Sequence, residues 1–354
     1  MKNNFTKAFK DKTVLITGHT GFKGTWLTQT LLNFGSKIYG VSLPSRDFNS
    51  KFFDCLDLRK KIIEYRFDIT EYKKLNELII KAKPDYIFHL AAQSILSKSL
   101  LDPHRTFKSN YNGMLNLLES LRFLKKKCSV VLVTSDKVYE NNNWIWGYRE
   151  NDKLGGDDPY SASKSSSEIL FQSYYKTFFR KQTNIRISTA RAGNVFGGGD
   201  WSKDRLIPDI LRSYYERKLL LIKNPSSTRP WQFVLEPING YLILGLKNYH
   251  SKKFNGEAFN FGPNLTNHIN VKSLLTEFIK IYPKLNYRLI KKNNTVEKNF
   301  LSLNSEKAIN QLNWSPKLSF IESVKKTAQW YEAFYLNNDI SEFTIKQINE
   351  YFNL

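Results

Sequence analysis

The chain has 354 residues, 41% of them hydrophobic and 14% aromatic, which is enough for one large α/β unit or two closely joined domains. No apolar run is long enough to span a membrane, and residues 1–12 are polar with scattered lysines rather than the apolar core of a signal peptide, so we expect a cytoplasmic enzyme without a membrane partner. Cys55 and Cys128 are the only cysteines, and no histidines cluster, which excludes a disulfide framework and predicts no metal site.

The net charge of +22 has two interpretations. A strongly basic chain can serve an anionic partner, such as nucleic acid, a membrane surface or a phosphorylated ligand. The charge can also reflect lysine-rich amino-acid usage, which the equally abundant asparagine supports. The lysines are scattered and accompany no recognisable DNA- or RNA-binding motif. We therefore favour the second interpretation and expect no nucleic-acid partner.

The first apolar run, 13–16, leads directly into a glycine-rich turn and then a helical pattern that ends near Gly35. A strand, a glycine turn and a helix in this order are typical of a dinucleotide-binding βαβ unit. Gly18 permits the tight turn, Gly21 lets the backbone approach a pyrophosphate, and Gly24 lets helix and strand pack closely. The helix N-terminus supplies amide donors to the phosphates. The predicted cofactor-binding residues in this stretch are Gly18, Thr20, Gly21, Phe22, Lys23 and Gly24.

The second predicted strand, 37–43, lacks the acidic residue that usually follows it and reads the ribose diol. Arg46 stands there instead, and it either meets the 2′-phosphate of NADP or is simply solvated, so the sequence leaves NAD and NADP open. Asp68 and Ile69 are placed to contact the adenine. The next buried strand, 86–90, runs into small residues that let a cofactor lie against the backbone. This adds Leu90, Ala91, Ala92 and Gln93 to the predicted cofactor site.

His89 lies inside this apolar strand, and we interpret it as a core histidine rather than a general base. A helix is predicted from near Pro103 through Leu124, with Asn110 along it.

The buried strand 130–133 delivers Thr134, Asp136 and Lys137 to its C-terminal end. Ligands bind at this edge of open α/β sheets. We expect Thr134 to hydrogen-bond a substrate oxygen, with a carboxylate and an amine beside it. Asp136 and Lys137 could instead be a turn-forming pair, but the motif that follows them favours chemistry.

That motif is the stretch 158–164, in which Tyr160 and Lys164 stand one helical turn apart on the same face. A phenol titrates near 10, and an ammonium beside it is expected to lower that pKa. Such a pair can take a proton from a sugar hydroxyl while the carbon is oxidised by hydride transfer. The alternative is an ordinary surface helix, because this spacing alone is a weak signal.

The predicted architecture is a Rossmann-like doubly wound parallel α/β sheet followed by a smaller C-terminal α/β substrate domain. The glycine-rich loop after strand 185–188 marks the change, which gives a cofactor domain at 1–196 and a substrate domain at 197–354. Short segments near 232–262 are expected to return to the first domain. Arg229 can pair bidentately with a diphosphate.

Taken together, these motifs resemble the extended short-chain dehydrogenases/reductases that act on nucleotide sugars. The narrower resemblance is to the CDP-glucose 4,6-dehydratases, and it extends over nearly the whole chain. It rests on the strings TGHTGFKG at 17–24, TSDK at 134–137, WIWGYRE at 144–150, RAGNV at 191–195, GGDW at 198–201, DRLIPDI at 204–210 and RPWQ at 229–232.

The resemblance implies a three-stage reaction with bound NAD: oxidation at C4 of CDP-D-glucose, loss of water across C5 and C6, and return of the hydride to C6. Tyr160, assisted by Lys164 and Thr134, would deprotonate the 4-hydroxyl, and Asp136 would protonate the departing 6-hydroxyl. Lys137 can be the C5 base only if it is neutral, so that base stays open. The implied binding residues are Asn110 and Arg191 for the cofactor, and Gln93, Asn194, Arg205, Arg229 and Trp231 for the substrate.

The chain also departs from the family pattern. Ser97 stands where an arginine is usual, and Asn299, Phe300 and Asn304 replace a His-Tyr pair and an aspartate near the nucleotide pocket. These changes leave the nucleotide base and the sugar less certain than the reaction.

The sequence also allows two alternative functions. A nucleotide-sugar 4-epimerase would share the cofactor unit and the Tyr160–Lys164 pair, but it needs no acid for a 6-hydroxyl, so Asp136 argues against it. A catalytically silent binding protein has no need of Thr134, Tyr160 and Lys164 together. The family further implies a homodimer or homotetramer built from the helices at 103–124 and 160–175.

Overall fold

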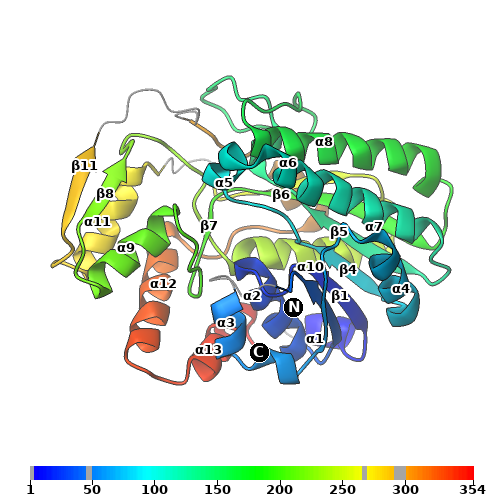
Figure 1. Cartoon of the computed structure of the whole chain (residues 1–354), viewed down its shortest axis with the longest axis horizontal. Coiled ribbons are helices and arrows are strands. Elements are labelled where there is room, and N and C mark those ends of the chain that lie inside the picture. Colours follow the sequence, from blue (N-terminus) through cyan, green and yellow to red (C-terminus); the bar gives the residue numbers. More distant parts are fainter. Residues whose placement is uncertain (1–3, 45–49, 265–268, 291–299) are drawn as a thin grey trace.

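In the computed structural model, a seven-stranded parallel sheet forms the centre of the molecule, with helices on both faces (Figure 1). The structure describes residues 4–44, 50–264, 269–290 and 300–354. The strand order is β10-β6-β5-β4-β1-β2-β3, and every neighbouring pair is parallel. The predicted Rossmann-like doubly wound sheet is therefore confirmed.

The strands of this sheet are β1 (Thr13–Thr17), β2 (Lys37–Ser42), β3 (Ile63–Arg66), β4 (Tyr86–His89), β5 (Cys128–Val133), β6 (Ile185–Ala192) and β10 (Ala258–Phe261). From β1 the chain adds β2 and β3 on one side, and then crosses back to place β4 on the other. The strand order thus reverses between β1 and β4, and in open α/β sheets ligands bind beyond the carboxyl ends of the strands at such a point.

The helices that cover the sheet follow from the alternation of apolar side chains along its strands. In β5, Val131 and Val133 join the core beneath α2 and α10, whereas Val130 and Leu132 join the core beneath α4, α7 and α8. The helices of the chain are α1 (Asn4–Phe9), α2 (Phe22–Asn33), α3 (Ser50–Cys55), α4 (Tyr72–Ala82), α5 (Leu96–Leu101), α6 (Pro103–Phe107), α7 (Gly113–Arg122), α8 (Pro159–Tyr174), α9 (Leu206–Tyr215), α10 (Leu235–His250), α11 (Val271–Ile281), α12 (Phe320–Tyr335) and α13 (Ile340–Phe352).

The second half of the chain builds a smaller layer beside the sheet, at the left of Figure 1, from α9, α11 and two short strands. These strands, β8 (Leu220–Lys223) and β11 (Tyr287–Ile290), pair in parallel, as do β7 (Val195–Phe196) and β9 (Gln232–Phe233). Within the predicted return segment, α10 packs on the main sheet and β10 extends it. The last helix, α13, packs on α2, a return that the sequence did not indicate. The division at 196/197 stays a prediction.

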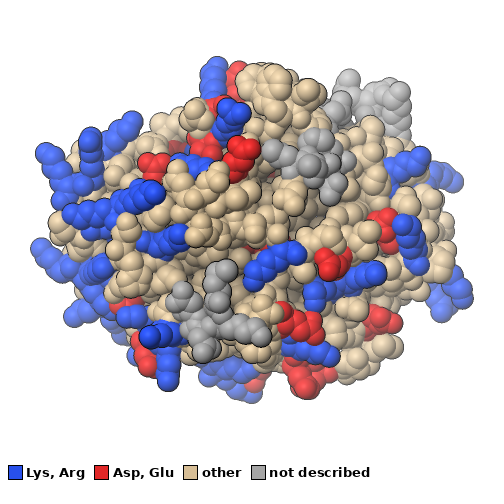
Figure 2. Space-filling view, turned by 180° about the vertical axis from the view of Figure 1, so that it is seen from behind, with Lys and Arg blue, Asp and Glu red and all other residues tan. Residues whose placement is uncertain are grey.

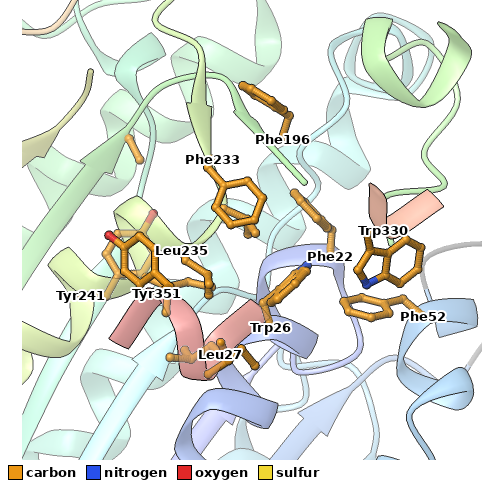
Figure 3. Close-up of a cluster of buried hydrophobic side chains, with 14 of the residues drawn as sticks. Phe22, Trp26, Leu27, Phe52, Phe196, Phe233, Leu235, Tyr241, Trp330 and Tyr351 are labelled. Atoms are coloured by element: carbon orange, nitrogen blue, oxygen red, sulfur yellow. The ribbon is translucent and has the colours of Figure 1, made fainter. Parts of the chain in front are cut away.

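A glycine loop that follows β7 joins the two halves of the chain. The Trp26 indole on α2 donates to the Gly198 carbonyl at 2.8 Å. Trp330 on α12 meets Phe52 on α3 edge to face, with ring centroids 5.2 Å apart (Figure 3). A Cβ atom on Gly198 would come within 2.0 Å of the Trp330 ring. The backbone of this loop therefore fits between aromatic side chains from both halves.

The basic side chains are dispersed over the face shown in Figure 2, with acidic residues between them. This distribution agrees with the interpretation of the charge as lysine-rich usage. Within the part of the chain that the structure describes, no helix has both the length and the apolar character needed to cross a bilayer.

We expect Gly198→Ala to lower the free energy of unfolding by about 3 kcal/mol, because the new methyl group overpacks a buried junction. Gly21→Ala is the matched control, since its Cβ would lie 3.4 Å from the nearest atom, an ordinary contact. Urea unfolding followed by tryptophan fluorescence measures both. Equal stabilities of the two variants would contradict the close fit at Gly198.

Candidate active site

The structure forms the predicted strand, turn and helix at the carboxyl end of β1. Gly18 has a φ of +74°, and its N–H donates to Val41 on the neighbouring strand at 2.8 Å. Gly24 packs so closely on the turn that an added Cβ would come within 2.1 Å of the Gly18 carbonyl oxygen. A side chain at either position would therefore force the turn open.

This turn fits the pyrophosphate of a dinucleotide. Helix α2 begins after Gly21, which supplies no side-chain cap, so the first-turn amides have no capping acceptor and the positive end of the helix dipole faces outward. A Cβ on Gly18 would also meet the Ala91 amide at 2.8 Å, so the chain after β4 lies directly against the turn. The predicted small-residue segment, Leu90 to Ala92, is only half-buried beside it.

Tyr160 and Lys164 lie on the first turns of α8, which begins at the Asp158 cap. The Asp158 carboxylate accepts from the Ser161 amide at 2.9 Å. Burial raises the pKa of Tyr160 to about 12, although a hydrogen bond with Ser135 opposes the shift. Burial likewise lowers the pKa of Lys164 to about 8, with Glu168 opposing. The lowered phenol pKa predicted from the sequence is therefore wrong for the chain itself, because desolvation dominates.

A buried network that the sequence did not indicate lies below this pair. Thr134 Oγ1 donates to Glu168 Oε1 at 2.6 Å, and the Arg191 guanidinium pairs with both Glu168 oxygens at 3.0 Å. Burial alone would raise the pKa of Glu168, but Arg191 and the hydroxyl donors hold it below its usual value. The missed signal is the spacing: Glu168 lies one further turn along the Tyr160–Lys164 face.

Arg191, which the family resemblance places at the cofactor, has internal hydrogen-bond partners in this structure. Its remaining donors go to the Tyr139 hydroxyl at 2.8 Å and the Glu150 carbonyl at 2.9 Å. The guanidinium is thus held by internal partners on several sides, and it fixes Glu168.

Asp136 and Lys137 lie in a short 3₁₀ turn after β5, as the turn-forming interpretation predicted, and their chemical role stays a prediction. Ser135 Oγ donates to Asp136 Oδ1 at 3.0 Å and accepts from the Lys137 amide at 3.2 Å. The other oxygen, Asp136 Oδ2, is buried without a hydrogen-bond partner among the described residues. Burial raises the pKa of Asp136, and the charge of Lys137 is the largest influence against that rise.

Two predicted binding residues, Gln93 and Asn110, make hydrogen bonds within the protein. The Gln93 amide group caps the following turn: it donates to Ile95 O and Thr106 Oγ1 at 3.1 and 3.0 Å, and it accepts from Ile95 N at 2.6 Å. Asn110 ties the Gln93 backbone to Ser163 Oγ on α8, at 2.7 to 3.0 Å. Both side chains are therefore committed to internal contacts that align α8 with the end of β4.

The two predicted phosphate-binding arginines act on different groups of the site. Arg205 pairs with Asp200 at 3.0 Å and donates to Ser94 Oγ at 3.1 Å, while its charge also acts on Tyr160. Arg229 donates to the Thr228 carbonyl at 2.8 Å, and its charge opposes the rise of the Asp136 pKa that burial causes.

Two further substrate candidates come from the segments around β7 and β9. Trp231 presents an indole N–H that is buried without a partner among the described residues. Asn194 is half-buried, and its backbone carbonyl accepts from the Gln232 backbone amide at 3.0 Å.

Three residues were considered for contacts with the adenosine part of the cofactor. Of these, Arg46 lies outside the described residues. Asp68 Oδ1 accepts from the Thr70 amide at 2.9 Å, and a Cβ on Gly113 would lie 2.4 Å from the buried Ile69. An acidic residue does occur near the end of β2, but it comes from β3: Glu64 bonds the His19 imidazole at 3.0 Å.

His89 is a core residue, as predicted. Its Nδ1 atom bonds Thr17 Oγ1 at 2.8 Å, and burial lowers its pKa to about 3. Of the replaced nucleotide-pocket residues, Asn299 lies outside the described residues, whereas Phe300 forms a bridge with Thr228 and Asn304 is buried. No group of His, Cys, Asp or Glu that could hold a metal occurs within the described ranges.

Comparisons of the sequence and of the fold with known proteins find dehydratases and epimerases. The family model described as GDP-mannose 4,6 dehydratase matches residues 15–327. A CDP-glucose 4,6-dehydratase from Salmonella typhimurium is 36% identical over 348 residues, 97% of each chain. Among solved structures, an epimerase from Methanothermobacter thermautotrophicus superposes with a TM-score of 0.81 at 23% identity, over 94% of this chain and 95% of that one. A dTDP-glucose 4,6-dehydratase from Streptomyces venezuelae, solved with NAD bound, gives 0.78 at 20% identity, over 90% and 97%.

We expect Glu168→Gln to destabilise the protein by about 3 kcal/mol, because it leaves the buried Arg191 charge without its counterion. Glu216→Gln is the control, since its partner Lys218 is exposed and such pairs contribute at most about 1 kcal/mol. Thermal unfolding of both variants measures the difference. If Glu168→Gln were as stable as Glu216→Gln, the network would not organise the site.

We expect Asp136→Asn to raise the melting temperature at neutral pH. The folded-state pKa of this carboxyl lies above its unfolded value, so its ionisation opposes folding increasingly as pH rises through the unfolded pKa, about 4. The gain should shrink as pH falls below that value. Melting curves of both proteins from acid to neutral pH measure it, and a variant less stable than the parent at neutral pH would contradict the assigned direction.

Proposed function

Because the chain belongs to the GDP-mannose 4,6-dehydratase family, we propose that it is a CDP-glucose 4,6-dehydratase, which converts CDP-D-glucose into CDP-4-keto-6-deoxy-D-glucose and water. The observation that carries this proposal is the buried Asp136 carboxyl, placed beside Tyr160 with one oxygen unpartnered. A C4 oxidation needs no such acid, whereas loss of the 6-hydroxyl does.

The proposed cofactor is NAD. The uncapped start of α2 and the glycine cradle suit its pyrophosphate, and related structures are solved with NAD bound. When bound, NAD would supply the acceptor for the C4 hydride and give that hydride back to C6, with no net consumption.

The protein's own residues would handle the protons. Tyr160 would accept the proton of the 4-hydroxyl, with the Lys164 ammonium stabilising the phenolate that forms. Thr134 donates its own hydrogen to Glu168, so its oxygen is oriented to accept a hydrogen bond from the sugar. Asp136 would donate a proton to the departing 6-hydroxyl, and burial favours its protonated form by raising its pKa. Burial thus prepares the acid for the elimination.

The remaining predicted residues would hold the nucleotide. Arg205 and Arg229 carry guanidinium groups suited to the diphosphate, and both act electrostatically on the Tyr160–Asp136 region. The unpartnered Trp231 indole N–H can donate to a polar group of the substrate. We further propose a cofactor domain, 1–196, and a substrate domain, 197–354, with α10 and β10 returning to the main sheet.

A nucleotide-sugar 4-epimerase is the second candidate, and a dehydratase for another nucleotide sugar is a third. The epimerase rests on the shared fold and the Tyr160–Lys164 pair. The dehydratase for another nucleotide sugar rests on the replaced residues Phe300 and Asn304. A silent binding protein is disfavoured, because an unsatisfied buried oxygen such as Asp136 Oδ2 costs about 1–3 kcal/mol and packing alone gives it no purpose.

We also propose a homodimer or homotetramer located in the cytoplasm. The predicted leucine stripe of α7 is largely used by the monomer core, since Leu117, Leu118 and Leu121 are fully buried. Other apolar side chains of the predicted interface segments stay exposed, with Phe123 at the end of α7 at 57% and Ile169 on α8 at 59%. They support an interface along α7 and α8.

Purified protein incubated with CDP-glucose and NAD should yield a product lighter by one water in mass spectrometry. Tyr160→Phe should abolish it. Asp136→Asn should slow it by about 10²–10⁴-fold, the usual contribution of a positioned general acid. A product of unchanged mass with an inverted C4 hydroxyl would favour the epimerase instead.

A further inference from the structure

Between β7 and α9 the chain forms a strap, residues 197–205, whose first part is buried. Both halves of the protein hold this first part in place. The Trp26 indole on α2 donates to the Gly198 carbonyl at 2.8 Å. The Tyr331 hydroxyl on α12 donates to the Asp200 carbonyl. The root of the strap therefore cannot move without breaking buried hydrogen bonds.

The tip of the strap is held to the first half of the chain by two hydrogen bonds, which we call the clasp. Ser97 Oγ on α5 donates to Asp204 Oδ2 at 2.8 Å. Arg205 Nη2 donates to Ser94 Oγ at 3.1 Å, while its Nη1 pairs with Asp200 at 3.0 Å. Both bonds of the clasp lie exposed to solvent, so their net free energy is small and they can open. The strap thus has a fixed root and a releasable tip.

The root and the tip contact the two elements that flank the glycine turn. The root packs on α2, which begins at that turn, and a Cβ on Gly197 would lie 3.5 Å from the Phe22 ring. The tip bonds the residues that follow segment 90–93, and a Cβ on Gly18 would meet the Ala91 amide of that segment at 2.8 Å. Because α2 follows β1 and this segment follows β4, the strap joins the carboxyl ends of two neighbouring strands. The strand order reverses there, which is where a dinucleotide is expected.

Two features of the sequence suit the clasp. Ser97 stands where the family pattern has an arginine, so this chain presents a short neutral hydroxyl to the strap instead of a long cation. Asp204 has a φ of +60°, in the left-handed region that aspartate and asparagine enter more readily than other residues with side chains. The backbone therefore turns sharply at Asp204 and brings its carboxylate to α5.

We propose, on the basis of the function assigned above, that Ser94 and Ser97 are positioning residues that clasp the strap over the bound dinucleotide and slow its release. The proposed reaction takes a hydride from C4 and returns it to C6, so one cofactor molecule has to stay bound through the whole turnover. Each serine acts through its partner on the strap, Ser94 through Arg205 and Ser97 through Asp204. An open clasp lets the cofactor exchange between turnovers.

The first test measures release of the cofactor in the absence of any sugar. The full-length protein is loaded with radiolabelled NAD, and the loss of label is followed after a large excess of unlabelled NAD is added. Ser97→Ala and Ser94→Ala should each speed release by roughly 5-fold, the factor that one net hydrogen bond supplies. The double variant should release the label faster than either single variant.

Two variants serve as controls for the release rates. Ser273→Ala makes the same chemical change on the exposed face of α11, where no hydrogen bond of the hydroxyl occurs within the described ranges, and it should release NAD at the parental rate. Asp204→Asn keeps an acceptor oxygen for Ser97 and tolerates the positive φ, so it should stay near the parental rate. All variants should melt close to the parent, because exposed bonds contribute little to global stability.

Turnover gives a second measurement that a purely structural role would leave unchanged. With CDP-glucose, the parent should work with the NAD that it carries, whereas the double variant Ser94→Ala/Ser97→Ala should require added NAD. The apparent KM for NAD should therefore rise in the double variant, while kcat at saturating NAD stays near the parental value.

Several outcomes would overturn the clasp. It is wrong if the double variant releases labelled NAD at the parental rate, or if Asp204→Asn releases it as fast as Ser97→Ala. It is also wrong if the double variant raises only the KM for CDP-glucose, or if faster release comes with a matching loss of thermal stability. If the parent binds NAD but removes no water from CDP-glucose, the proposed function fails, and the release rates alone still decide whether the clasp retains the cofactor.

Discussion

The buried ion pair between Glu168 and Arg191 is the contact on which the site depends. It links α8 to β6 across two N–H···O bonds of 3.0 Å, and Glu168 also accepts from Thr134 on the segment after β5. Removal of one partner would leave an uncompensated charge in the core, and such losses cost about 3–5 kcal/mol. The pair thereby fixes the helix that carries Tyr160 relative to the strand ends that carry Thr134.

Above this pair, burial sets the protonation states that a dehydratase needs. Desolvation favours the neutral form of any ionisable group, so the same environment raises the pKa of Asp136 and lowers the pKa values of Lys23 and Lys164. The pKa values of a carboxyl and of amines in this region therefore shift toward each other.

The sequence predicted what depends on local chemistry, and it missed what depends on contacts between distant segments. The turn at Gly18, the first strand and the positions of Tyr160 and Lys164 follow from spacing and glycine geometry. The internal bonds of Gln93 and Asn110 required knowing that the end of β4 lies beside α8, and a pattern of residue types cannot distinguish such a scaffold contact from a ligand contact. Glu168 was overlooked because its partners are 23 and 34 positions away in the chain.

The docking of α13 on α2 and the raised pKa of Tyr160 have the same origin. Both follow from burial in the complete fold, which leaves no local pattern in the sequence.

The most direct test of the account uses CDP-glucose that carries deuterium at C4. We predict a product that has lost water and holds the deuterium at C6, because the C4 hydride returns there. A product of unchanged mass that keeps its deuterium at C4 would contradict the account.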